Sequence, residues 1–190
     1  LEDSIRNAGR LVREAGAGAV KLEGGRKRIP VIEAVLNAEI PVMGHLGLTP
    51  QSVHAMGGYK VQGRQEAVAR ELLQDAKALD AAGVFAIVLE GVPDVLAGMI
   101  TENVTVPTIG IGAGAVTDGQ VLVFHDALGL HTGHYPKFVR RYANLFDDAV
   151  SALEQYCEDV RAGTFPGPEE TYTMPEDSAE ALQGDQPSGE

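Results

Sequence analysis

The protein has 190 residues, of which 44% are hydrophobic and 22% are charged. This composition is typical of a globular domain with a sizeable core, and it excludes a collagen-like rod, a small disulfide scaffold and a wholly disordered chain. Its 15 basic and 27 acidic residues give a net charge of −12. Such an acidic chain is a poor partner for nucleic acids and for acidic membrane surfaces.

The sequence contains no stretch long enough for a membrane-spanning helix. The longest uncharged apolar stretches, such as Val84–Leu89 and Val104–Ile111, fall far below the roughly 18 residues that such a helix needs. No basic, apolar leader opens the chain, and the single cysteine, Cys157, cannot form an internal disulfide. We therefore expect a cytoplasmic protein.

Charge is unevenly distributed along the chain. Residues 163–190 contain seven acidic side chains and neither lysine nor arginine, which leaves 20 acidic and 15 basic residues in residues 1–162. The C-terminal stretch is also rich in proline, glycine, serine and threonine. We predict a folded domain over residues 1–162 and an acidic, largely disordered tail over residues 163–190.

Short β-branched apolar runs alternate with longer amphipathic stretches, which is the pattern of βα units with a parallel sheet. The predicted strands are residues 19–23, 40–45, 85–89, 107–111 and 121–124. The predicted helices are residues 4–15, 31–37, 65–82, 93–101 and 137–161, the last as one helix or a helix pair.

Five strands of this kind fit either an open doubly wound sheet or the later part of a (β/α)8 TIM barrel. Polar residues follow successive strand ends, and in a barrel these ends converge on one mouth. The chain also opens with a helix that no strand precedes, whereas a barrel typically needs about 250 residues. The sequence therefore favours an α/β barrel that lacks about the first three strands.

Three strand ends carry residues suited to chemistry. Lys21 and Glu23 lie two apart and share one face of a strand, where they form either a rim salt bridge or part of an interior site. His45 ends the next strand, as a core histidine or a site residue. Glu90 follows a buried apolar run, and this position fits two interpretations equally: a cap or salt bridge at the strand end, and a base toward a carbon acid.

A glycine-rich turn, Gly110–Gly114, follows the predicted strand 107–111. It lacks the Gly-Lys-Ser/Thr ending of a nucleotide-binding loop and opens no clear helix. We interpret it as a tight turn at a strand end where backbone approaches a ligand.

Several blocks of the sequence together resemble the ketopantoate hydroxymethyltransferase family, in family order and with family-like spacing over nearly everything from Leu1 to about Tyr172. The blocks are Val20–Gly25 (VKLEGG), Gly44–Ser52 (GHLGLTPQS), Gly57–Arg64 (GGYKVQGR), Leu89–Pro93 (LEGVP), Ile109–Gly114 (IGIGAG) and Asp118–Val123 (DGQVLV).

The resemblance implies a barrel enzyme that transfers a one-carbon unit from 5,10-methylenetetrahydrofolate to 3-methyl-2-oxobutanoate, giving 2-dehydropantoate for pantothenate and coenzyme A synthesis. It implies Mg²⁺ as the metal that holds the keto acid, and a large homo-oligomer. Glu90 matches the proposed base, Lys21 and His45 match substrate contacts, and Val123 matches a backbone contact to the substrate. Glu23 matches a carboxylate that reaches the metal through water.

The sequence departs from the family in the residues that bind the metal. The two direct aspartate ligands of the family lie on strands that precede the helix with which this chain begins, and Asp3 in that helix is no substitute. Two alternatives therefore stay open beside the transferase: another metal-dependent keto-acid lyase barrel, and an inactive truncated barrel that serves as an assembly subunit.

Overall fold

The computed structural model describes residues 1–52, 58 and 60–184, which form two compact units. Unit 1 consists of Leu1–Ala127 and Gly133–Arg140. Unit 2 consists of Leu128–Thr132, Arg141 and the residues that follow it. Unit 1 contains the sheet and every candidate site residue named above.

A five-stranded parallel sheet forms the centre of unit 1, with its strands side by side in chain order. The strands are β1 (Val20–Glu23), β2 (Val42–Gly47), β3 (Ala86–Glu90), β4 (Thr108–Ile111) and β5 (Gly119–Gln120). Because all strands run in the same direction, their carboxyl ends lie along one edge of the sheet. This confirms the α/β class and the parallel sheet.

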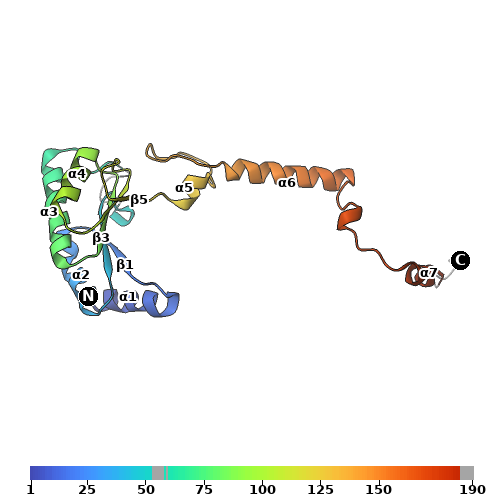
Figure 1. Ribbon diagram of the computed structural model, residues 1–190, viewed down its shortest axis with the longest axis horizontal. Coiled ribbons are helices and arrows are strands. Elements are labelled where there is room, and N and C mark those ends of the chain that lie inside the picture. Colours follow the sequence, from blue (N-terminus) through green and yellow to red (C-terminus); the bar gives the residue numbers. More distant parts are fainter. Residues whose placement is uncertain (53–57, 59, 185–190) are drawn as a thin grey trace. The chain divides into compact units, whose positions relative to one another are not determined.

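Helices connect the strands, and α2, α3 and α4 lie along one face of the sheet (Figure 1). The helices of unit 1 are α1 (Glu2–Ala15), α2 (Ile29–Asn37), α3 (Glu66–Ala82), α4 (Asp94–Asn103) and α5 (Phe124–Leu128), with short 3-10 turns η1 (Arg26–Arg28) and η2 (Pro50–Ser52). No helix of the described part of the chain is both long and apolar enough to cross a membrane.

Alternation along the strands decides which side chains enter the core. On β3, Ile87 and Leu89 are fully buried against the helices, while Val88 and Glu90 point to the opposite face. The same alternation on β2 sends Val42 and Leu46 into the helix-side core and His45 to the other face. Burying this many aliphatic side chains supplies most of the driving force for folding unit 1.

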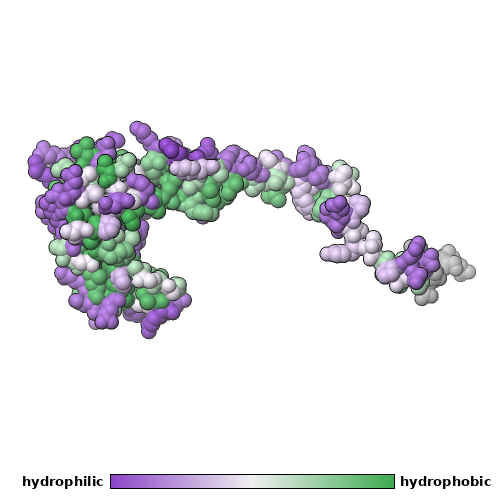
Figure 2. Space-filling model, viewed as in Figure 1, coloured by the Kyte–Doolittle hydropathy of each residue, from purple (hydrophilic) through white to green (hydrophobic). Residues whose placement is uncertain are grey.

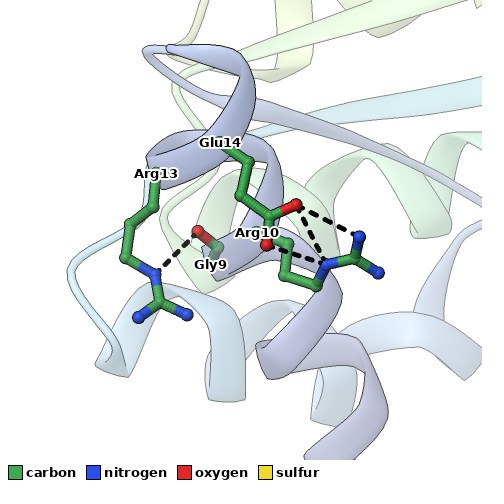
Figure 3. Close-up of polar contacts among 4 residues, drawn as sticks. All are labelled: Gly9, Arg10, Arg13 and Glu14. Atoms are coloured by element: carbon green, nitrogen blue, oxygen red, sulfur yellow. Dashed lines mark hydrogen bonds and ion pairs between the residues drawn. The ribbon is translucent and has the colours of Figure 1, made fainter.

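The charged side chains of α1 lie on its exposed surface and take no part in this core. Arg10 donates to both carboxylate oxygens of Glu14 at 3.0 to 3.3 Å, and Arg13 donates to the carbonyl of Gly9 (Figure 3). Exposed pairs of this spacing stabilise a helix by only about 0.3–0.5 kcal/mol. Ala8 is the residue that joins α1 to the core.

Unit 2 is largely helical. It contains α6 (Leu145–Ala162), η3 (Pro168–Glu170) and α7 (Glu176–Gly184). Apolar side chains of α6 reach the surface among polar ones, including Leu153 and Tyr156 (Figure 2). Helix α7 lies within the segment for which the sequence predicts a largely disordered tail, so that segment is not devoid of regular structure. Residues 185–190 lie outside the described residues.

Most predicted elements are confirmed within about two residues, and two are corrected. The fifth strand covers Gly119–Gln120 and not residues 121–124, because the chain leaves the sheet after Val121 and Val123 already starts α5 by accepting a bond from Ala127. The long helix starts at Leu145 and not at residue 137. Pro136 and Val139 form a turn, and the ring of Phe138 packs against Gly112 instead.

A polar bridge ties β4 to the loop before β5. The backbone N–H and the hydroxyl of Thr108, which is fully buried, donate to Asp118 at 2.8 and 3.0 Å. These hydrogen bonds favour the ionised carboxylate, and they lower the pKa of Asp118 below its usual value. The hydrogen-bonded connection between β4 and the loop before β5 therefore depends on an ionised Asp118.

We expect Asp118→Asn to destabilise the protein at neutral pH and to flatten its pH dependence in acid. Because the folded-state pKa is depressed, the stabilisation is present above the unfolded pKa and is lost as the pH falls from about 4 through the folded value. Urea unfolding at pH 7 and pH 3 measures this. Glu102→Gln, which removes an exposed carboxylate from α4, is the control; equal pH dependence in Asp118→Asn and the unaltered protein would contradict the prediction.

Candidate functional site

Three titratable side chains from neighbouring strands meet at the carboxyl edge of the sheet. His45 Nε2 lies 3.0 Å from Glu90 Oε2, and His45 Nδ1 lies 3.7 Å from Glu23 Oε1. One imidazole therefore stands between two carboxylates. These are three of the residues that the sequence singles out, now in direct contact.

The imidazole is the most buried member of the group. His45 is 1% exposed, and the side chains of Glu23 and Glu90 are 13% and 17% exposed. Neither ring nitrogen makes an aligned hydrogen bond with the described residues, although Nε2 is close enough to Glu90 for one. Buried polar atoms left in this state are uncommon and costly, and they concentrate at functional sites.

Strand register produces this arrangement. Glu23 pairs with His45 across β1 and β2, and His45 pairs with Val88 across β2 and β3. Glu90 lies two residues after Val88 and therefore projects from the same face. The Gly24 N–H donates to the His45 carbonyl at 2.9 Å, which fixes the end of β1 against β2.

Gly47 permits the close approach of β2 to β3. It has a φ of 93°, and a Cβ at this position would lie 2.1 Å from the carbonyl oxygen of Glu90. The same carbonyl accepts a hydrogen bond from the Leu48 N–H at 2.7 Å. The backbone of Glu90 is thus held from the side of β2.

The two carboxylates are held differently. Glu23 Oε2 accepts a hydrogen bond from the backbone N–H of Gln51 in η2 at 3.1 Å. Glu90 accepts no aligned hydrogen bond from the described residues and has only its contact with His45. Sequence reasoning missed Gln51, because a backbone donor leaves no signal in the residue type.

Lys21 lies on the same face of β1 as Glu23, one pleat further from the edge. Its side chain is exposed and makes no ion pair with an acid anywhere in residues 1–52, 58 and 60–184. The rim salt bridge with Glu23 is therefore not formed. An unpaired ammonium on the face that carries His45 and Glu90 can bind an anionic group.

Val123 follows β5 at the same edge of the sheet. Its side chain is half exposed, and its carbonyl accepts a hydrogen bond from the Ala127 N–H at 2.9 Å. Val123 lies three residues after the end of β5, whereas the other candidate site residues lie within their strands, and no contact among the described residues links it to the histidine group.

The glycine turn after β4 is filled by the chain itself. A Cβ at Gly112 would lie 2.6 Å from the ring of Phe138, and one at Gly114 would lie 2.6 Å from Asp94. Both glycines have positive φ, at 64° and 81°. The close approach predicted for a ligand is thus made here by side chains of unit 1.

The described residues include no group of three or more histidine, cysteine, aspartate or glutamate side chains arranged to hold a metal ion. Mg²⁺ prefers near-octahedral oxygen ligands, and one oxygen of Glu23 is already bonded to Gln51. These residues alone do not fit a complete Mg²⁺ site.

Comparison with known proteins places the chain in a family. Residues 1–168 match the family model described as ketopantoate hydroxymethyltransferase, and the chain belongs to this family. It is 59% identical over 182 residues to the 3-methyl-2-oxobutanoate hydroxymethyltransferase of Methylobacterium sp. (strain 4-46), covering 96% of this chain and 63% of that protein.

Other relatives carry the same name. The chain is 55% identical to the protein of Syntrophomonas wolfei, covering 95% of this chain and 66% of that protein. It is 51% identical to the protein of Clostridioides difficile (strain 630), covering 96% and 66% respectively. The chain thus spans 63% to 66% of the length of these three curated relatives.

We expect Gly47→Ala to destabilise the protein and to displace Glu90. A positive φ alone costs a residue with a Cβ about 1–2 kcal/mol, and the overlap with the Glu90 carbonyl adds to this. Gly16→Ala is the matched control, since Gly16 also has a positive φ but has open space around its Cβ position. Urea denaturation compares the two; an equal loss of unfolding free energy would show that the close approach at Gly47 is unimportant.

Proposed function

We propose that the protein transfers a one-carbon unit from 5,10-methylenetetrahydrofolate to 3-methyl-2-oxobutanoate, giving 2-dehydropantoate on the route to pantothenate and coenzyme A. Family membership and the names of the relatives support this reaction. The structural observation that carries it is the Glu90 carboxylate, 3.0 Å from a buried imidazole and free of other hydrogen bonds with the described residues.

The strand order supports a (β/α)8 barrel as the complete fold. A doubly wound sheet reverses its strand order at a switch point, whereas β1 to β5 follow one another and α2, α3 and α4 lie on one face. Right-handed crossovers that always move in one direction place all helices outside, as in a barrel. Residues 1–162 then form its later part, and residues 163–190 an acidic tail.

Glu90 has the position and freedom of a general base. We assign it the removal of the proton from C3 of the keto acid, which leaves the electron pair of the broken C–H bond in an enolate. The enolate carbon then bonds to the methylene carbon of the folate, and the two C–N bonds that held this carbon break. Water supplies the hydroxyl oxygen of the product, and the two folate nitrogens receive one proton from water and the proton taken up by the base, which leaves tetrahydrofolate. A carboxylate already bonded to the backbone, as Glu23 is, would be less free to take up this proton.

The remaining site residues orient the reactants. Lys21 binds the carboxylate of the keto acid, since its ammonium is exposed and unpaired among the described acids. His45 contacts the keto acid only at its ring edge, because 1% of it is exposed, and it also orients the Glu90 carboxylate. The backbone at Val123 contributes a further contact to the substrate.

The metal enters no step here, because the described residues do not form its ligand set. We propose Mg²⁺ as the family's ion, reached by Glu23 through water, with direct aspartate ligands that residues 1–190 do not supply. We also propose that the protein works as a homo-oligomer in the cytoplasm.

We expect Glu90→Gln to abolish turnover while substrate binding survives, because the amide keeps the shape of the side chain and removes the base. The direct measurement is exchange of the C3 proton of 3-methyl-2-oxobutanoate with deuterium, followed by NMR on the full-length protein without folate. Exchange should vanish in the variant and persist in Glu33→Gln, which alters an exposed carboxylate of α2. Exchange at the unaltered rate in Glu90→Gln would transfer the base role to another group.

We expect the 190-residue chain alone to bind Mg²⁺ weakly and to show no hydroxymethyl transfer. A single water-mediated carboxylate falls short of the one or two direct carboxylates, completed by waters and substrate, that hold this ion. Isothermal titration of the chain and of the full-length protein with Mg²⁺ and keto acid compares them. Matching affinity in the two would show that ligands within residues 1–190 suffice.

A further inference from the structure

A cavity of about 650 Å³ adjoins the site on the outer side of Glu23. We propose that it binds the glutamyl tail of the folate co-substrate, an anionic chain that leaves the reacting end of that molecule near Glu90. This inference rests on the proposed function and assigns part of the co-substrate to named residues. Its walls come from the loop after β1, from Thr49 and from α3: Glu23, Gly24, Gly25, Arg26, Lys27, Arg28, Thr49, Glu71 and Asp75.

Two of the three consecutive cations in this wall are available to a ligand. Arg26 is already committed, since its Nε lies 2.6 Å from Asp75 Oδ1 and its backbone N–H donates to the same oxygen at 3.1 Å. Lys27 and Arg28 are exposed, and neither forms an ion pair with a described residue. Adjacent unpaired cations stand out in a chain with a net charge of −12.

The six ionisable lining residues carry three positive and three negative charges, and Lys27 and Arg28 are the two cations among them that are not paired with an acid. Asp75 is neutralised by Arg26, and Glu23 is turned toward His45 and the N–H of Gln51. Glu71 on α3 is the one exposed acid among the lining residues. It offsets one of the two cationic charges, and its position on another element leaves room for a ligand carboxylate beside Lys27 and Arg28.

Two features hold this wall in place next to the site. The side chain of Arg28 lies over Gly24, where its Cγ is 2.8 Å from the position that a Cβ would take, and Gly24 has a φ of 115°. Thr49 lines the cavity although only 3% of it is exposed, and its hydroxyl has no hydrogen-bond partner among the described residues. A hydroxyl without a partner on a residue that lines the cavity is available to an amide or a carboxylate.

The chemistry of the tail matches these groups. Each glutamyl unit brings one more carboxylate and an amide, and charge-assisted bonds to lysine and arginine are the strong contacts that carboxylates make in proteins. The cavity adjoins Glu23, which contacts His45, so the tail would extend outward from the catalytic group. The contacts are at the surface, and added salt should weaken them.

The test compares folates with one and with three glutamates on the full-length protein. We expect the triglutamate to have the lower KM, and the double variant Lys27→Gln/Arg28→Gln to raise that KM about tenfold, as loss of one charged hydrogen bond does. The monoglutamate KM and kcat should change less than about twofold. Arg13→Gln, which removes an exposed cation from α1, is the control.

A binding measurement without catalysis separates this inference from the proposed function. The probe is p-aminobenzoyl-triglutamate, titrated into the unaltered protein and the double variant at low and high salt. At least tenfold weaker binding by the variant supports the tail site even where no transferase activity is found. Equal binding by the two proteins, or an unchanged ratio of the two KM values, would overturn it.

Discussion

Parallel pairing of β1, β2 and β3 is the constraint on which the candidate site depends. In this register Glu23 lies opposite His45, and Glu90 projects from the same face two residues beyond the partner of His45. A shift of one residue in any of the three strands would turn one of these side chains into the helix-side core. The aliphatic core therefore constrains the site indirectly, because burial of Ile87, Leu89 and Val42 on one face turns the three titratable side chains to the other face.

The sequence predicted the sheet well because its inner strands are continuous apolar runs with turn signals at both ends. It also predicted the placement of Glu23, His45 and Glu90, since residues at the carboxyl ends of parallel strands must share an edge. The direct contact of these three side chains could not be predicted from the sequence. Contact depends on register and on the approach of β2 to β3 at Gly47, and neither follows from residue type alone.

Two predicted elements are wrong: the strand over residues 121–124 and the start of the long helix at residue 137. Val121 and Val123 have the residue types of a strand, and residues 137–144 have a pattern compatible with a helix. In the first place the chain leaves β5 and turns into α5, whose first turn is closed by the bond from the Ala127 N–H to the Val123 carbonyl. In the second, the ring of Phe138 packs over Gly112. Local preference is a weak prior, and a contact between distant residues, such as the ring of Phe138 over Gly112, can override it.

The carboxylates of Glu23 and Glu90 are held in place by different contacts. Glu23 is bonded to the backbone at Gln51, so its position is fixed by η2 as well as by β1. Glu90 is fixed through its backbone at Gly47 and Leu48, and only His45 touches its carboxylate among the described residues. In the proposed reaction, the buried His45 would orient the Glu90 carboxylate, and Glu90 would take up the proton. In the proposed reaction, the charged end of the co-substrate would lie at Lys27 and Arg28, past Glu23 on the same edge of the sheet, and its reacting end would lie near Glu90.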